Sequence, residues 1–599
     1  MFGRPELIGQ FGAVSSTHWL ASGAGAAVLE QGGNAMDAAV AAGFVLQVVE
    51  PHSNGLGGDV SIVTYSAESG AVSVLCGQGP MPAVATVDSV RSLGLDHLPG
   101  SGLLPATVPG AFGGWLRALG EFGTMRLAPL LKPAIGYAER GYPLPVDAAS
   151  AIASLAPLFA TEWSESGRVF LDGSGAAPAA GSRMRNAALA ATLRRISTQA
   201  AAASRDRQAQ LDAAHRAFYQ GFVAEQVDTF VRDSAVLDAT GRHHRGFLTG
   251  QDMAGFTVTP EPPACIDYRG HTVCKPGPWS QGPVFLQQLA LVEGLDLSDM
   301  GLDSGAYLHA MTEAAKLAFA DRDAWYGDPA VVDVPLDTML GPDYTRVRTA
   351  LIGPDAAAAP QPGRPDGRTS FVPRFGNQAP KRIASDWMTQ LQSGLPTVVL
   401  AATARSGDTC TVVTADRWGN LVAAVPSGGW LKSSPVIAGL GFPLGTRGQT
   451  MCLDAGHPNA LAPGKRPRTT LSPTVVLRDG GPCMAFGTPG GDRQDQWTLA
   501  SFVAAVDFGL DLQAATEVPT FHTDHFPSSF APHSHRPGVL VVEDDYPAAT
   551  WADLRRRGHR LDVVPKHSMG GRVCMVGMAE GFLRAGAGPR GRQAYAYCR

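Results

Sequence analysis

A long apolar segment, followed at once by glycines and two strand-like runs, most constrains the fold of this chain. Residues 23–50 have the composition of a helix, and AMDAAVAAGFVLQVV (35–49) is apolar almost all round, as in a helix buried on every side. The glycines of NGLGGD (54–59) end that helix, and strand-like runs follow at 60–67 and 71–76. This order predicts a sheet edge buried under a layer of helices.

Further elements are indicated by capping and strand signals. Asn34 and Asp37 stand three positions apart and are suited to cap a second helical segment. In the C-terminal third, two apolar runs rich in β-formers flank a polar turn at 416–420 and predict a hairpin. The other elements expected there are strands at 474–479 and 483–488 and a helix at 497–510. Together they predict a mixed fold of helices and sheets.

The composition is that of an ordinary globular protein. The 599 residues include 45% hydrophobic and 17% charged residues, with a net charge of −5. Because there is no basic stripe, binding to nucleic acid or to an anionic membrane is not expected. No run approaches ~18 apolar residues, so no membrane span is predicted. The segment MFGRPELIGQFGAVSS lacks the charged and apolar regions of an export signal, so a cytoplasmic location is expected.

Eight cysteines are scattered along the chain without the CxxC spacing of a metal site. Since no export signal is seen, reduced thiols are expected. We also expect neither a metal nor a cofactor.

The segment SGDTCTVVTADRWGN (406–420) carries the most informative chemistry. Cleavage between Asp408 and Thr409 would make Thr409 an N-terminal residue, whose hydroxyl can attack a carbonyl while its own α-amino group takes the proton. Taken alone, the motif equally fits a turn that leads into a strand. Cys410 is a rival nucleophile, but adjacent residues on a strand point to opposite faces, so only one of the two can face a site.

Several further blocks of sequence bear on this choice. They are residues 18–59, 105–115, 122–142, 458–476 and 485–494, together with the threonine segment itself. In order and spacing they resemble the γ-glutamyltransferase family of N-terminal-nucleophile hydrolases over nearly the whole chain. The resemblance implies an α+β fold, a four-layer αββα sandwich. It places the nucleophile at Thr409 and leaves Cys410 to packing.

The resemblance also implies processing and a small-molecule substrate. A large (α) subunit, 1–408, and a small (β) subunit, 409–599, would stay associated as one αββα catalytic unit, a heterodimer of the chain's own products. A dimer of such heterodimers is left open. The uncut chain would then be a zymogen activated by autocatalytic cleavage.

Individual residues around the nucleophile receive roles in the same way. Gly490 and Gly491 in GTPGG match the glycine pair whose backbone N–H groups form the oxyanion hole. Ser427 matches a hydroxyl residue that bonds to the nucleophile, and Thr469 and Thr470 match a pair that holds a substrate carboxylate. By residue type alone, the same positions fit a tight turn, a solvated loop serine and strand-edge packing.

Three positions depart from the family's pattern for γ-glutamyl recognition. Gln78 stands where the family has an arginine that clamps the substrate α-carboxylate, and a neutral amide cannot form that charge-assisted pair. Gly429 replaces an asparagine expected two residues after Ser427. Asp454 is displaced from the usual pair of acids that holds the α-amino group. The acyl-transfer machinery is therefore retained while the amino-acid pocket is rebuilt.

These observations support an autoprocessed hydrolase or acyltransferase acting on a small amide or acyl substrate other than glutathione. The divergent branch that the sequence resembles includes amidohydrolases, acylases and enzymes of specialised (antibiotic) metabolism that hydrolyse a C–C bond of an oxalyl-type side chain. One alternative is a true γ-glutamyl transferase, with Arg447, Arg468 or Arg493 in place of the clamp. The other is an unprocessed, non-catalytic binding protein.

Overall fold

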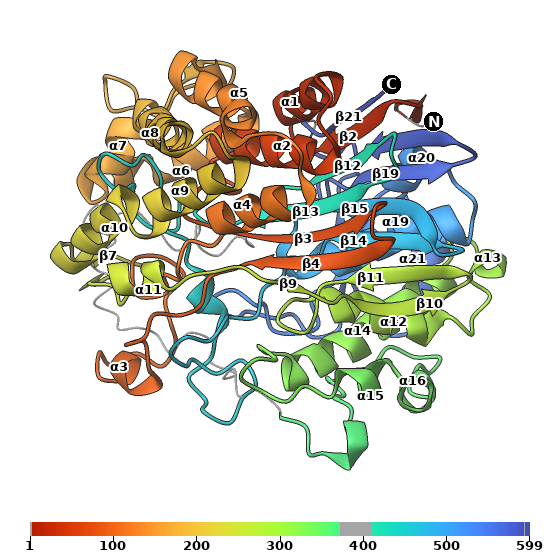
Figure 1. Ribbon diagram of the computed structural model, residues 1–599. Coiled ribbons are helices and arrows are strands. Elements are labelled where there is room, and N and C mark those ends of the chain that lie inside the picture. The colour runs from red at the N-terminus through yellow and green to blue at the C-terminus, as the bar shows by residue number, and fades with distance from the viewer. Residues whose placement is uncertain (1–2, 372–408, 592) are drawn as a thin grey trace.

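Two seven-stranded antiparallel sheets form the centre of the computed structural model, which describes residues 3–371, 409–591 and 593–599 (Figure 1). The first sheet consists, in spatial order, of β21 (Tyr595–Cys598), β2 (Gly12–Ser16), β12 (Val412–Asp416), β13 (Leu421–Ser427), β3 (Asp59–Ser66), β4 (Ala71–Gly77) and β9 (Pro260–Glu261). The second consists of β1 (Leu7–Gly9), β20 (Phe582–Ala587), β19 (Cys574–Ala579), β15 (Gly481–Gly487), β14 (Thr474–Arg478), β11 (His271–Lys275) and β10 (Ala264–Tyr268). Each sheet therefore contains strands from both sides of Thr409.

The two sheets pack face to face through small and branched apolar side chains. Val63 and Val413 of the first sheet share one buried cluster with Val475, Ala485 and Val576 of the second. All five side chains are fully buried. Alternation along each strand gives one face to this cluster and the other to a helix layer.

Helices cover the outer face of each sheet. A large apolar cluster joins the first sheet to α1 (Trp19–Glu30), α2 (Ala35–Val49), α4 (Ala111–Phe122), α5 (Leu127–Arg140), α6 (Val146–Thr161), α7 (Ser164–Phe170), α8 (Ala187–Ala203), α9 (Arg207–Tyr219), α10 (Phe222–Asp233) and α11 (Gly250–Ala254). A second cluster joins the other sheet to α12 (Gly282–Val292), α13 (Leu297–Met300), α14 (Gly305–Trp325), α19 (Gln494–Val506), α20 (Leu512–Glu517) and α21 (Ala548–Arg556). The four layers form the αββα sandwich that the resemblance implied.

Smaller elements complete the described chain. The short helices are α3 (Val87–Arg91), α15 (Leu336–Leu340) and α16 (Pro342–Thr349), with 3-10 turns η1 (Pro365–Gly367), η2 (Arg447–Thr450) and η3 (Gly491–Arg493). The small sheets are β16 (Phe521–Thr523), β17 (Val539–Glu543) and β18 (Arg560–Val564); β5 (Tyr142–Pro143) with β6 (Arg183–Met184); and β7 (Val236–Leu237) with β8 (His243–His244). No helix among the described residues is both long enough and apolar enough to span a bilayer.

Most of the expected elements are present. Every residue of α2 is buried, and Asn34 and Asp37 form a capping box at its start. The predicted hairpins are β3–β4 and β12–β13. The first of them does not lie at the very edge, because the two-residue strand β9 pairs with β4 beyond it. The helix expected at 497–510 begins and ends earlier, spanning Gln494–Val506.

Candidate active site

Thr409 lies just before β12 in the first sheet. It forms an isolated antiparallel bridge with Ser427, the last residue of β13, and Thr409 Oγ1 lies 3.2 Å from Ser427 Oγ. Both residues are 1% exposed. In this arrangement the Ser427 hydroxyl can donate to, or accept from, the attacking oxygen. Asp408, the other half of the predicted cleavage site, lies outside the described residues.

Ser427 connects Thr409 to two further polar residues across the sheet. Ser427 is the direct partner of Asp59 in β3, and the next residue of β3, Val60, pairs with Gly77 of β4, which directly precedes Gln78. Residues directly opposite each other in antiparallel strands project from the same face. Thr409, Ser427, Asp59 and Gln78 therefore form a line across neighbouring strands, which we call the site row.

Arg447 is bound to the site row through Asp59. Its Nε and Nη2 donate to the two carboxylate oxygens of Asp59 at 2.6 and 2.9 Å, and the arginine is only 2% exposed. Trp430 and Phe530 flank the guanidinium, whose carbon lies 5.6 and 5.7 Å from their ring centres. Within the described structure, the buried Nη1 has no hydrogen-bond partner. Leaving such a donor unpaired costs ~1–3 kcal/mol, so this N–H is well suited to a bound ligand.

The other two candidate arginines are held elsewhere. Arg468 Nη1 donates to the carbonyl of Arg322 at 3.1 Å and lies 3.2 Å from the carboxylate of Asp323. Arg493 lies 3.3 Å from Asp524. Among these three arginines, Arg447 is the one that contacts the site row.

Gln78 joins the site row to the segment that contains the threonine pair. It is 1% exposed, and its Nε2 donates to the carbonyl of Pro467. Thr469 N donates to the carbonyl of Trp279 at 2.9 Å, and Thr470 Oγ1 is buried without a hydrogen-bond partner among the described residues. The Gln78 side chain is thus bonded to the backbone two residues before the threonine pair. As a neutral amide, it brings no charge with which to hold a carboxylate.

Gly429 and Asp454 have different surroundings. Gly429 has φ +61°, and a Cβ added there would lie 3.0 Å from Gly58 N, so an asparagine at this position would be strained. Asp454 is exposed in a turn, where its carboxylate accepts from Gly456 N at 3.4 Å. The structure does not bring Asp454 to the site row, and the row's acidic residue is Asp59. The sequence signal for Asp59 was an aspartate directly after a glycine pair at the start of a buried strand.

The glycine pair Gly490 and Gly491 follows β15 in the facing sheet. Their φ angles are +139° and +58°, and a Cβ added at Gly490 would lie 2.3 Å from Cζ3 of Trp497. The end of β15, just before this loop, lies close to the start of β12, since a Cβ added at Gly487 would lie 3.0 Å from Cγ2 of Thr411. Only glycine fits such a conformation and approach without strain. The loop's backbone is therefore presented close to the strand that follows Thr409.

A buried ion pair lies against the segment that contains Thr409, on the face opposite to the site row. Arg572 Nη1 donates to Glu50 at 2.6 Å, and Arg572 Nη2 reaches the carbonyl of Thr409 at 3.5 Å. Cys410 Sγ lies 3.1 Å from the Glu50 carboxylate and accepts from Asn54 Nδ2 at 3.0 Å. Sequence reasoning did not find this pair, because neither charge has a neighbour in sequence that marks it.

This environment gives Glu50 and Cys410 opposite ionisation behaviour. Burial by itself raises the pKa of Glu50, but the charges of Arg572, His18 and His52 and the hydrogen bond from Thr17 together outweigh it and lower that pKa to about 2. Burial and the Glu50 charge raise the pKa of the Cys410 thiol well above its usual value. Cys410 therefore remains a neutral packed thiol, which leaves the Thr409 hydroxyl as the nucleophile candidate on the row face.

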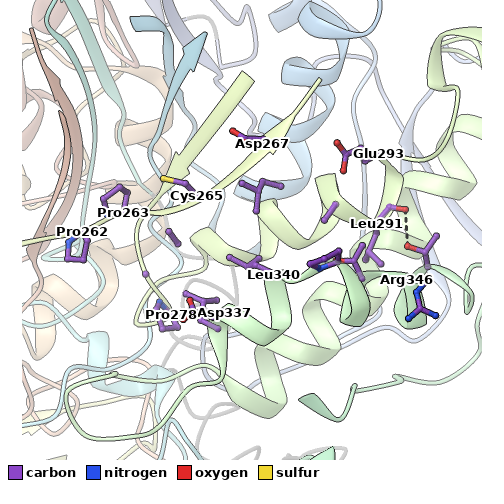
Figure 2. Close-up of a pocket in the computed structure, with 18 of the residues that line it drawn as sticks. Pro262, Pro263, Cys265, Asp267, Pro278, Leu291, Glu293, Asp337, Leu340 and Arg346 are labelled. Carbon is purple, nitrogen blue, oxygen red and sulfur yellow. Dashed lines mark hydrogen bonds between the residues drawn. The ribbon is translucent and has the colours of Figure 1, made fainter. Parts of the chain in front are cut away.

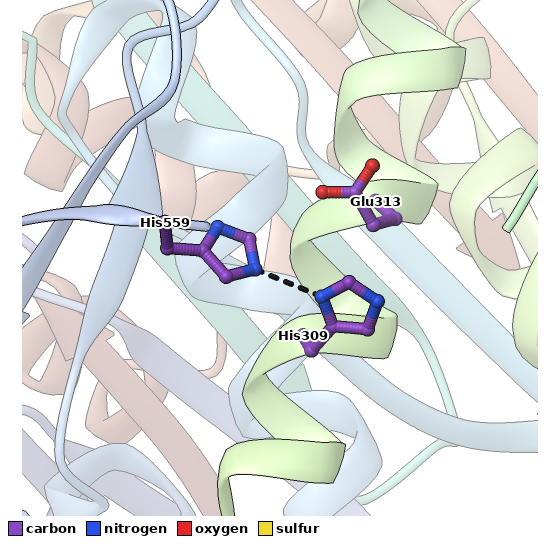
Figure 3. Close-up of side chains that lie close together, drawn as sticks. All are labelled: His309, Glu313 and His559. Carbon is purple, nitrogen blue, oxygen red and sulfur yellow. Dashed lines mark hydrogen bonds between the residues drawn. The ribbon is translucent and has the colours of Figure 1, made fainter. Parts of the chain in front are cut away.

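One group among the described side chains has the residues and spacing to hold a cation. The ligand atoms of His309 and Glu313 on α14 and of His559 before β18 all lie within 4.8 Å of one another (Figure 3). These atoms already have protein partners: His309 Nδ1 lies 2.8 Å from His559 Nε2, His309 Nε2 lies 2.8 Å from the Gly353 carbonyl, and Glu313 accepts from Lys316 at 2.7 Å. Hydrogen bonds account for this cluster, so we assign it to packing.

Known proteins resemble the chain over nearly its full length. A Bacillus subtilis (strain 168) "Glutathione hydrolase-like YwrD proenzyme" is 31% identical over 590 residues, covering 98% of each chain. A Klebsiella pneumoniae "Oxamate amidohydrolase proenzyme" is 29% identical over 601 residues, again covering 98% of each. The solved "Structure of LmbA2991HD" is 47% identical with a TM-score of 0.91 and full coverage of both chains. A cephalosporin acylase from Bacillus halodurans is 29% identical, with a TM-score of 0.82 and coverage of 100% of this chain and 97% of that one.

The match to a family model agrees with these similarities. The gamma-glutamyltranspeptidase model matches residues 21–598. The chain belongs to the gamma-glutamyltranspeptidase family of N-terminal-nucleophile hydrolases and is an enzyme of the acyl-transfer and hydrolysis type.

Proposed function

We propose that this enzyme cleaves its own chain between Asp408 and Thr409 and then uses Thr409 as an N-terminal nucleophile. In the uncut chain, Thr409 Oγ1 attacks the carbonyl carbon of Asp408, the peptide C–N bond breaks, and water hydrolyses the resulting ester. The α-amino group freed in this way becomes the base for later turnovers. The contact of 3.2 Å between Thr409 Oγ1 and Ser427 Oγ supports this proposal most directly.

Each turnover then follows the usual course of acyl transfer. The α-amino group takes the proton of Thr409 Oγ1 as the oxygen attacks the acyl carbon, and it returns a proton to the departing group as the scissile bond breaks. Backbone N–H groups at Gly490 and Gly491 stabilise the developing oxyanion. Water releases the acid from the acyl-enzyme, whereas an amine acceptor would complete a transfer.

For the substrate, we propose a small amide or acyl compound that carries a carboxylate close to the reacting carbonyl. The unpaired Nη1 of Arg447 supports this, since it is a buried cationic donor attached to the site row through Asp59. Thr470 Oγ1 supplies a second unpartnered donor. Oxamate, the substrate named for one relative, places a carboxylate beside its amide carbonyl. An oxalyl-type side chain in specialised metabolism, hydrolysed at a C–C bond, has the same feature.

The competing proposal is true γ-glutamyl transfer with Arg447 as a substitute clamp. The observation that favours it is the bond of Arg447 to Asp59, since Asp59 begins β3 and the neighbouring strand β4 ends just before Gln78. A γ-glutamyl substrate also needs an acidic partner for its α-amino group, and the exposed Asp454 is poorly placed for that task. Asp59, already bound to Arg447, would have to serve both groups. This shortage of partners makes the smaller carboxylate substrate the better proposal.

Two measurements test the proposal. The mass and N-terminal sequence of the purified protein should show fragments 1–408 and 409–599 that copurify, because each sheet contains strands from both; one full-length chain would contradict the processing step. Hydrolysis rates should then be compared for oxamate-type amides, a γ-glutamyl anilide and an amide without a carboxylate. Fast turnover of the γ-glutamyl anilide would overturn the substrate assignment.

Gln78→Arg should not create strong γ-glutamyl activity, because the partners for the α-amino group would still be missing.

A further inference from the structure

Two cysteines face each other at the edge of the second sheet, away from the site row. Cys265 on β10 stands directly opposite Cys274 on β11, and their sulfur atoms lie 2.7 Å apart. Among the described strands, β10 is the last of its sheet and pairs only with β11. All eight cysteines are free thiols.

The hairpin register puts this pair at a position suited to a disulfide. The loop has two residues in the left-handed region, Arg269 with φ +47° and Gly270 with φ +76°, so the residues flanking it form a hydrogen-bonded pair. Hydrogen-bonded and non-hydrogen-bonded pairs alternate from there, which makes Cys265 and Cys274 a non-hydrogen-bonded pair with Cα atoms ~4.5 Å apart. Disulfides span Cα separations of ~4.4–6.8 Å. A bond can therefore form without moving the backbone.

A cavity gives small molecules access to one of the two sulfurs. Cys265 is exposed and lines a cavity of about 1150 Å³ bounded by β10, α12, α15 and α16, where Figure 2 shows it near Pro263. Pro278 and Leu340 contribute apolar surface to the same space. No residue of the site row lines it. Cys274 is buried, so a molecule in the cavity meets Cys265 first.

The order of reaction follows from this asymmetry. The contact with Cys265 and burial both raise the pKa of the Cys274 thiol, so Cys274 is a poor first nucleophile. Once Cys265 carries a leaving group, however, Cys274 already lies beside its sulfur. Cys265 is therefore the attacking thiol and Cys274 the resolving one.

We propose that Cys265 and Cys274 form a reversible disulfide by exchange with a low-molecular-mass disulfide that enters the cavity. The Cys265 thiolate attacks one sulfur of the incoming disulfide, forming a mixed disulfide and releasing one thiolate. Cys274 then loses its proton to water and attacks the Cys265 sulfur, which releases the second thiolate. Two protein thiols are oxidised to one disulfide, and the incoming disulfide is reduced to two thiols. This site does not depend on the chemistry of Thr409.

Oxidised glutathione is the probe for the test. The reduced, folded protein is incubated with it, alkylated, and digested with trypsin, which cuts after Arg269 and so separates the two cysteines. The expected product is a pair of tryptic peptides joined through Cys265 and Cys274 and separated again by dithiothreitol. Cys274→Ser should instead retain glutathione on Cys265. Cys265→Ser should leave Cys274 unmodified.

Controls separate this site from general thiol oxidation and from the active site. Cys452, which is partly exposed, should acquire at most glutathione and no internal partner. Thr409→Ala should form the Cys265–Cys274 bond as fast as the unmodified sequence does. If Cys265 and Cys274 remain separately alkylated while Cys452 reacts, or if Cys265 keeps glutathione in the presence of Cys274, the proposal is wrong.

Discussion

The guanidinium of Arg447 donates two hydrogen bonds, of 2.6 and 2.9 Å, to the carboxylate of Asp59, while its third nitrogen, Nη1, has no partner among the described residues. Because Asp59 is the strand partner of Ser427, and Ser427 contacts Thr409, this ion pair lies on the face of the sheet that carries Thr409. Asp59 fixes the orientation of the planar guanidinium, while Nη1 stays available to donate to a ligand. An anion anchor at this point would position an acyl group for attack.

Arg447→Met should weaken turnover of substrates that carry a carboxylate near the reacting carbonyl. Loss of such a charged contact typically costs ~2–5 kcal/mol, which is at least about 30-fold in kcat/KM. The variant also leaves Asp59 as an unpaired buried charge, so stability will fall. The decisive measurement is therefore the ratio of kcat/KM for two amides that differ only in the carboxylate. An unchanged ratio would rule out Arg447 as the anchor.

Thr409→Ala should remain a single chain and show no hydrolysis, because it removes the hydroxyl that we propose attacks in both processing and turnover. Cys410→Ala is the matched control, since its thiol is buried on the opposite face beside Glu50. That variant should still split and retain most activity. Gel electrophoresis and N-terminal sequencing follow the cleavage. Cleavage of the Thr409→Ala chain between the same two residues would show that the hydroxyl attack is wrong.

Gly490→Ala should reduce kcat by ~10²–10³, the usual cost of losing an oxyanion donor. The added methyl would lie 2.3 Å from the Trp497 ring at a φ of +139°, so the loop backbone must shift. Gly464→Ala is a suitable control, because Gly464 also has a positive φ (+68°) but nothing within 4 Å of the added methyl. The control should lose some stability and little kcat. Equal kcat losses in the two variants would indicate general strain instead.

Glu50→Gln should destabilise the fold at neutral pH and less so in acid. The folded pKa of Glu50 is about 2 against an ordinary value of 4.5, so its ionised form is favoured in the folded state. The ionised Glu50 therefore stabilises the folded state above pH 4.5. This contribution is lost as the pH falls toward 2 and the carboxylate is protonated in the folded state. The shift corresponds to about 3 kcal/mol. Urea unfolding at pH 7 and at acid pH should show the difference between the two proteins shrinking.

The control for that measurement is Glu121→Gln, in which the carboxylate lost belongs to an exposed pair with Arg117. Exposed pairs contribute only ~0–1 kcal/mol, so this variant should unfold almost as the unmodified protein does. A constant destabilisation of Glu50→Gln across the pH range would mean that packing, and not charge, explains the loss.

Elements whose signals lie within a few residues were predictable from the sequence. The Asn34–Asp37 capping box, the buried helix α2 and the hairpins β3–β4 and β12–β13 all depend on contacts between near neighbours. Thr409 lies just before β12 and Ser427 ends β13 of the same hairpin, so their pairing could also be anticipated from the family resemblance. The start of α19 was predicted too late, because the 3-10 turn η3 runs directly into this helix and no side-chain cap marks its first residue.

By itself, the sequence predicted a mixed fold of helices and sheets, and its family resemblance implied the αββα class, the position of Thr409 and a glutamine, Gln78, where an arginine is expected. Only the tertiary structure showed which buried charges pair near Thr409, because Arg447 and Asp59 are 388 positions apart and Glu50 and Arg572 are 522 apart. Local propensity carries no information about such pairs. They form where strand register and sheet packing bring buried charges together, and a buried charge must find a partner or remain costly.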